Sequence, residues 1–262
     1  MIDNFGYPSK KTQEGEITSK NFETLGGVPC VENIGFGKVV GYVGNEILAL
    51  QKPAPNMATM SANFVSSNVI NCNVTVIEIS SNEKQVDPVT TAISPVTFAT
   101  SNDATYDLLA AAIETAGGTG VNCTVDDTAK TIIVTHDENK VVYLSDIVVT
   151  AGASQATPTY SFSGTLLGPV PKAEIEQDAD GVAQYTPTMI VAPLQKGSMY
   201  MKSIDAINYA STCCVQFIDN GTTKRGDLRT GTDSGKAMAF SSLVPDGKED
   251  AGALVNIKLN RP

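Results

Sequence analysis

The sequence has no tryptophan, a single histidine and few charged residues, which make up 18% of its 262 positions. One histidine cannot form a zinc site without cysteine or carboxylate ligands. No motif for a nucleophilic serine or cysteine surrounds His136, so we interpret it as a solvent-facing turn residue at the end of a strand. Paired catalytic carboxylates, a glycine-rich cofactor loop and a metal-binding cluster are also lacking. We therefore expect a protein that is not an enzyme, with no catalytic residue, no cofactor and no metal site.

Clusters of lysine and arginine are missing as well. The net charge is −10 and the isoelectric point is about 4.6. A surface that binds nucleic acid or an anionic membrane needs grouped basic side chains, so we expect neither partner. The N-terminus lacks the basic and apolar regions of a signal peptide, and no apolar run is long enough to span a bilayer. We expect synthesis and folding in a cytoplasm.

The five cysteines form no even framework and no CxxC motif. We interpret them as reduced thiols, mostly buried in strands. They are Cys30, Cys72, Cys123, Cys213 and Cys214. The last two are adjacent, so their side chains should point to opposite faces of a strand.

What the sequence does contain is typical of a β-rich globular protein. Hydrophobic residues make up 42% of the chain, and Val, Thr, Ser and Asn are frequent. We expect a mainly β fold with an N-terminal extended arm, a β-barrel or β-sandwich base domain, and a small α+β domain inserted into the base. The arm is residues 1–29, the base is residues 30–70 and 166–262, and the insertion is residues 71–165.

The arm carries several Gly and Pro residues and little apolar periodicity. It is either a disordered terminus or an extended strap that orders on a partner, and it can form a short helix over 18–25. In the base, residues 38–43 and 46–50 flank Gly44-Asn45, a two-residue turn that predicts a hairpin. Residues 56–70 are small and polar and indicate a connector. Further strands of the base are predicted at 188–192, 198–204, 212–218, 237–241 and 254–259.

One helix is predicted in the insertion. Apolar residues recur at helical spacing over 104–116, with Asn102 or Asp103 as the N-cap and Gly117-Gly118 as the stop. The expected apolar face consists of Leu108, Leu109, Ala112, Ile113 and Ala116. Strands are predicted around it at 72–79, 95–100, 120–125, 130–136, 141–150 and 157–163.

The charge is unevenly placed along the chain. Residues 71–165 hold 3 basic and 11 acidic side chains, a net charge of −8, whereas residues 166–262 carry a net charge of −1. A segment that docks closely on a partner tends to avoid a field of one sign, and a segment that projects into solvent tolerates it. We therefore expect the base to dock and the insertion to project.

Three short motifs have an ordinary structural interpretation. Residues 231–237 resemble a phosphate-binding loop, but the spacing is one residue short and Ala237 replaces the Ser or Thr, so a turn before a strand is expected. The tripeptide Arg225-Gly226-Asp227 matches one that some cell-surface receptors bind, and we interpret it as a turn. Alternating carboxylates either hold Ca²⁺ on one strand face or form a solvated edge that resists pairing. These carboxylates are Glu174, Glu176, Asp178 and Asp180.

Three segments of the outer blocks share a pattern. Gly35-Phe36-Gly37 leads into a strand, Tyr185-Thr186-Pro187 opens another, and residues 252–262 form a Gly-led final strand that ends in proline. This pattern resembles the capsid decoration, or structural cement, proteins of tailed phages. The family often has glycine at the position of Thr188, so the sequence departs from it there.

The central block carries a second resemblance. Residues 97–105, the following helix, and residues 121–126 and 130–135 are similar to strand-helix-strand-strand modules inserted in phage head and tail structural proteins. Together the resemblances imply a virion protein on the outer surface of an icosahedral capsid, made in the cytoplasm of the bacterial host. They imply that the major capsid protein is its partner and that it is a homotrimer, with a homodimer as the alternative. Such a protein stabilises the shell because it binds the assembled lattice and not the dissociated one.

We expect apolar side chains of the arm and of the first strand pair to contact the capsid. These are Phe5, Tyr7, Ile17, Phe22, Leu25 and Phe36. One alternative is a tail, baseplate or head-fibre component that contacts host glycans, although aromatic residues make up only 6% of the chain. Another is a hydrolase whose site carries no recognised motif.

Overall fold

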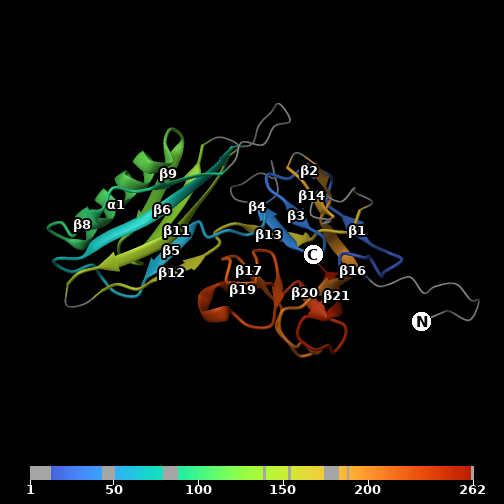
Figure 1. Ribbon diagram of the computed structural model, residues 1–262. Coiled ribbons are helices and arrows are strands. Elements are labelled where there is room, and N and C mark those ends of the chain that lie inside the picture. Colours follow the sequence, from blue (N-terminus) through green and yellow to red (C-terminus); the bar gives the residue numbers. More distant parts are fainter. Residues whose placement is uncertain are drawn as a thin grey trace, which may run out of the picture.

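The computed structural model describes most of the chain, and the fold is mainly β (Figure 1). The described residues are 13–42, 51–78, 88–137, 140–152, 155–173, 183–187 and 189–260. They contain one α-helix, one short 3-10 helix and 21 strands. Phe5, Tyr7, the expected strand at 46–50 and the carboxylates from Glu174 to Asp180 lie outside the described residues.

The central part of the chain forms two antiparallel sheets with one helix. One sheet has the order β12-β5-β10-β9, and the other has the order β11-β6-β7 with β8 paired to β6. The strands of the first are β5 (Met57–Met60), β9 (Val121–Asp126), β10 (Thr131–His136) and β12 (Pro158–Ser161). Those of the second are β6 (Val69–Glu78), β7 (Val89–Ala92), β8 (Val96–Thr97) and β11 (Lys140–Thr150). Helix α1 (Asn102–Gly117) packs against β9 and β6.

Local signals explain why α1 forms where the sequence predicts it. The side chain of Ser101, not that of Asn102 or Asp103, caps the helix by accepting a hydrogen bond from the backbone of Ala104 at 3.1 Å. Gly118, with φ +83°, ends it. The expected apolar face was partly wrong, because Leu108 is 51% exposed and Tyr106 is fully buried instead.

The central unit begins earlier than the composition indicated. Residues 57–60, expected within a connector, form β5, which pairs with both β10 and β12. Ala58 and Met60 are buried in the same cluster as Leu109 and Ile132. Strand β6 begins at Val69, before the expected boundary at residue 71. Strand β5 was not predicted, because its four residues are too few to show alternation. They are buried because β10 and β12 pair with them on both sides.

The outer blocks form one four-stranded sheet and several smaller ones. The order β1-β16-β21-β20 joins β1 (Glu23–Thr24), β16 (Leu194–Lys202), β20 (Leu243–Pro245) and β21 (Leu254–Asn260). One face of this sheet is buried in the core, and its side chains there include Met199, Met201, Val255 and Ile257. The paired strands are β2 (Val28–Pro29) with β15 (Ile190–Val191), β3 (Ile34–Gly35) with β14 (Gln184–Tyr185), and β4 (Val39–Tyr42) with β13 (Thr165–Pro169). A three-stranded sheet has the order β18 (Leu228–Arg229), β17 (Cys214–Gln216) and β19 (Ala237–Ala239).

The N-terminal segment 13–29, which we call the strap, pairs with this base. Ile17 forms an antiparallel bridge with Met199, and β1 pairs with β16. A Cβ atom at Gly197 would lie 2.6 Å from the Oγ of Ser19, so glycine at this position lets the strap cross β16 closely. The helix that this segment could form over 18–25 is not present, because residues 18–22 are not helical and Glu23–Thr24 form β1.

Candidate functional site

The structure distributes the expected contact residues between the core and the surface. Ile17, Leu25 and Phe36 are partly buried against the protein's own core clusters. Phe36 packs edge-on to Tyr185, with 5.7 Å between the ring centres. Phe22, in contrast, is 50% exposed. Among the described members of that set, only Phe22 therefore presents a large apolar surface to a partner.

Two of the sequence segments on which the resemblance depends lie side by side. Gln184 pairs with Gly35, and Tyr185 pairs with Ile34, as β14 joins β3. Gly37, with φ +71°, donates its backbone N–H to the carbonyl of Val170 at 2.8 Å. The two segments are far apart in the sequence, so their contact could not be read from it.

A second exposed apolar residue, Ile190, was not expected at the surface. It is 62% exposed and packs over Gly27, where a Cβ atom would lie only 2.3 Å from its Cγ2. Phe22 lies beside Gly197, at the other end of the antiparallel run between the strap and residues 190–197. We call Phe22, Ile190 and the strands β1 and β2 the docking face. The exposure of Ile190 could not be predicted from the sequence, because an isoleucine in a predicted strand carries no signal that distinguishes a buried from an exposed face.

The docking face carries little net charge. Glu23 and Lys196 form an ion pair across it at 3.5 Å, with side chains 70% and 57% exposed. Such an exposed pair contributes little to stability, but it cancels the charge next to Phe22. A neutral surface with protruding apolar side chains fits close contact with another protein.

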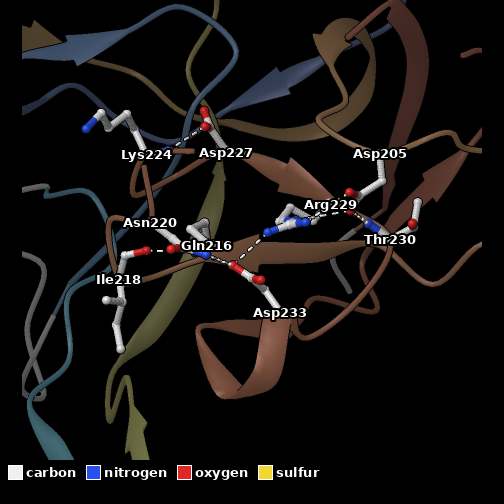
Figure 2. A network of polar contacts seen from close by, with 9 residues as sticks. All are labelled: Asp205, Gln216, Ile218, Asn220, Lys224, Asp227, Arg229, Thr230 and Asp233. Atoms are coloured by element: carbon white, nitrogen blue, oxygen red, sulfur yellow. Dashed lines mark hydrogen bonds and ion pairs between the residues drawn. The ribbon is translucent and has the colours of Figure 1, made fainter. Parts of the chain in front are cut away.

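In the C-terminal part of the chain, a cluster of charged side chains joins several loops of the base (Figure 2). The guanidinium of Arg229 donates two hydrogen bonds to Asp205, at 2.9 and 3.0 Å. It also forms an ion pair with Asp233 at 2.7 Å. Asp233 accepts further hydrogen bonds from Gln216 and Asn220, both at 3.1 Å. The cluster thus joins the loop after β16, strand β18 and the 3-10 helix η1 (Asp233–Gly235).

The same contacts lower the pKa of both carboxyl groups. Hydrogen bonds from Arg229 are the main cause for Asp205. For Asp233 the main cause is the side chain of Asn220, followed by that of Gln216. Each interaction favours the charged form of the carboxylate.

We expect acid to weaken the fold through this cluster. Because the folded pKa of Asp205 and of Asp233 is lowered, the unfolded chain binds more protons than the folded chain in acid. The stabilisation is complete above about pH 5 and is lost as the pH falls through the lowered values. Urea unfolding of the wild type and of the Asp205→Asn, Asp233→Asn double variant across this range tests the point. The double variant should lose less stability on acidification, and equal losses would contradict the assignment.

The charged side chains of the tripeptide Arg225-Gly226-Asp227 form ion pairs within the molecule. Arg225 forms an ion pair with Glu32 at 2.6 Å. Asp227 is only 4% exposed and forms an ion pair with Lys38 at 2.6 Å. This agrees with the interpretation as a turn, since the side chains of both Arg225 and Asp227 are paired with charged residues of the same chain. Residues 231–237 likewise contain η1 and lead into β19, which confirms the expected turn before a strand.

The thiols and the histidine are buried or partly buried in the fold. All five cysteines are free, as expected, and desolvation by burial raises the pKa of Cys30, Cys72, Cys123 and Cys213 to about 12. A thiol with so high a pKa is a poor nucleophile near neutral pH. His136 is the last residue of β10 and is partly buried, with its ring over Gly120, so the expectation of a solvent-facing turn was wrong in part.

Within the described part of the chain, no group of three or more His, Cys, Asp or Glu residues is arranged to hold a metal ion. Over the same residues, no helix is both long and apolar enough to cross a bilayer. No protein-family model matches the sequence, and a search of curated proteins gives no significant match.

Proposed function

We propose that this protein is a structural component of a tailed-phage virion that decorates the outside of the capsid. It binds the major capsid protein through the docking face and bridges neighbouring subunits of the shell, without catalysis. The observation that carries this proposal is the exposure of Phe22 and Ile190 along the paired strap. Because each side chain is already partly covered, burial of its exposed part against a partner favours association by about 1–1.5 kcal/mol.

The placement of charge supports this orientation. Helix α1 and β9 lie at one end of the molecule in Figure 1, and β1 and β2 lie at the other end. The acidic residues of α1 and β9 are thus remote from the docking face and can project from the shell, and these are Asp103, Asp107, Glu114 and Asp126. Their repulsion would keep decorated particles apart in solution.

Copy number in the virion tests the proposal directly. Quantitative mass spectrometry of particles of the phage that encodes this chain should give copies comparable to those of the major capsid protein. We also expect a homotrimer in solution, by light scattering, rather than a homodimer. A few to a few dozen copies would instead assign the protein to the tail or to one vertex. Absence from the particles would overturn a virion role.

The docking face can be tested by charge substitution. Phe22→Asp or Ile190→Asp should weaken binding to capsids that lack the protein by about 10-fold or more, since a charged side chain replaces an apolar contact. Co-sedimentation with such capsids measures the effect. Val244→Asp is the matched control, because Val244 is 48% exposed on β20, the opposite edge of the four-stranded sheet. Equal losses in all three variants, or none, would exclude this face.

A further inference from the structure

A cleft with a mixed polar and apolar lining lies between the central sheet and the base. Its volume is about 340 Å³, within the range of small-molecule sites. Asn73, Thr75 and Tyr143 line it from β6 and β11, and Thr90 lines it from β7. Arg225 lines it from the loop after β17. The sequence offered no signal for this site, because its walls come from distant segments.

The wall on the base side is fixed by contacts within the protein. The guanidinium of Arg225 lies 5.3 Å from the ring centre of Tyr143 and 2.6 Å from the carboxylate of Glu32. Its backbone N–H donates to Asp219 at 2.8 Å. These contacts hold the wall in place before any ligand binds, which lowers the entropy cost of binding. They also neutralise the one arginine of the cleft.

The wall on the sheet side presents a row of hydrogen-bonding groups. The amide of Asn73 donates to Oδ2 of Asp146 at 2.9 Å, and the hydroxyl of Ser145 lies 3.2 Å from the same oxygen. Neither contact uses Oδ1 of Asp146. The hydroxyls of Thr75 and Thr90 lie 2.8 Å apart. Thr75 itself is buried, whereas Thr90 and Asp146 are exposed, so these two side chains are the ones on this wall that a ligand meets first.

Asp146 has an unusual backbone conformation. Its φ is +52°, and the pairing of β11 with β6 shifts register between Ser145 and Val148. A bulge of this kind redirects a side chain, and a strained residue of this kind is often found at a binding site. Here the strained residue is the carboxylate that lines the cleft.

From this geometry we infer that the cleft binds a neutral saccharide. Hydroxyl, amide and carboxylate groups match the hydroxyls of a sugar, which both donate and accept. Ile218 and the edge of Tyr143, both partly exposed, supply apolar surface for the C–H groups of the ring. Asp146 and Asp219 line the cleft while the charge of Arg225 is balanced by Glu32, so an anionic ligand is disfavoured. This inference does not depend on the capsid proposal.

Saturation-transfer NMR on the full chain tests the inference. The probes are the methyl glycosides of glucose, galactose, mannose, N-acetylglucosamine and N-acetylgalactosamine, with inorganic phosphate and N-acetylneuraminic acid as anionic probes. At least one neutral glycoside should bind with a Kd on the order of 1 mM, as expected for so small a ligand. Absence of transfer to every neutral glycoside, or binding of the anionic probes alone, would overturn the inference.

Asp146→Asn locates the binding. An asparagine keeps an oxygen for Asn73 and tolerates a positive φ, so the bulge should persist. The loss of a charge-assisted hydrogen bond should weaken sugar binding by about 10-fold. Asp126→Asn on β9 is the matched control, because this exposed carboxylate lies outside the cleft. Unchanged affinity in Asp146→Asn, or equal weakening in both variants, would place the binding elsewhere and overturn the inference.

Discussion

Replacement of Arg229 by alanine should lower the free energy of unfolding by about 2–3 kcal/mol. The substitution removes two hydrogen bonds to Asp205 and the ion pair with Asp233, and leaves two carboxylates without their shared cation. Removal of one partner from a fully buried pair costs about 3–5 kcal/mol. The expected loss is smaller here because the three side chains are still 16–30% exposed. Urea unfolding near neutral pH measures it.

Two further variants separate charge from geometry in this cluster. Arg229→Lys keeps the charge but cannot form the two parallel hydrogen bonds to Asp205, so we expect about half of the alanine effect. Lys258→Ala is the matched control, because its ion pair with Asp246 joins side chains that are 56% and 36% exposed. It should cost less than about 1 kcal/mol. A loss for Arg229→Ala as small as that of the control would show that the cluster does not hold the loops together.

Elements with strong local signals were predicted well from the sequence. Helix α1 has a periodic apolar face and a double-glycine stop, and its observed range extends the predicted one by only a few residues. Strand β9 alternates apolar and polar residues, and β10 and β11 contain runs of β-branched residues. All three were predicted close to their observed bounds. In these segments, the residues that determine the local conformation are the same ones that are buried.

Elements that depend on distant partners were missed. Strand β5 has too short a sequence to show alternation, and β10 and β12 hold it in place on both sides. The strap has no periodicity because its main contacts are backbone hydrogen bonds, such as the one from Thr18 to Ser198 at 2.8 Å. Of the surface sites, Phe22 could be identified as an apolar residue in a polar segment. Ile190 and the bulge at Asp146 could not, because their exposure and conformation are set by tertiary pairing.

Tertiary pairing also makes one glycine indispensable, and Gly168→Ala should lower the free energy of unfolding by about 2–3 kcal/mol. Gly168 lies in β13, where the register to β4 shifts between Leu166 and Gly168. A Cβ atom there would lie 2.0 Å from the carbonyl oxygen of Leu194 in β16. Because that neighbour is backbone, it cannot move aside as a flexible side chain could. The strand would have to shift away from the sheet on which the strap is paired.

Gly231→Ala is the matched control for this prediction. No heavy atom lies within 4 Å of a Cβ built on Gly231, which is exposed. The same chemical change there should leave stability unchanged or raise it slightly, because alanine restricts the unfolded chain. If Gly168→Ala unfolds at the same urea concentration as Gly231→Ala, the close approach of β13 to β16 is wrong. If it unfolds at lower urea than Gly231→Ala, the close approach of β13 to β16 contributes to the stability of the fold.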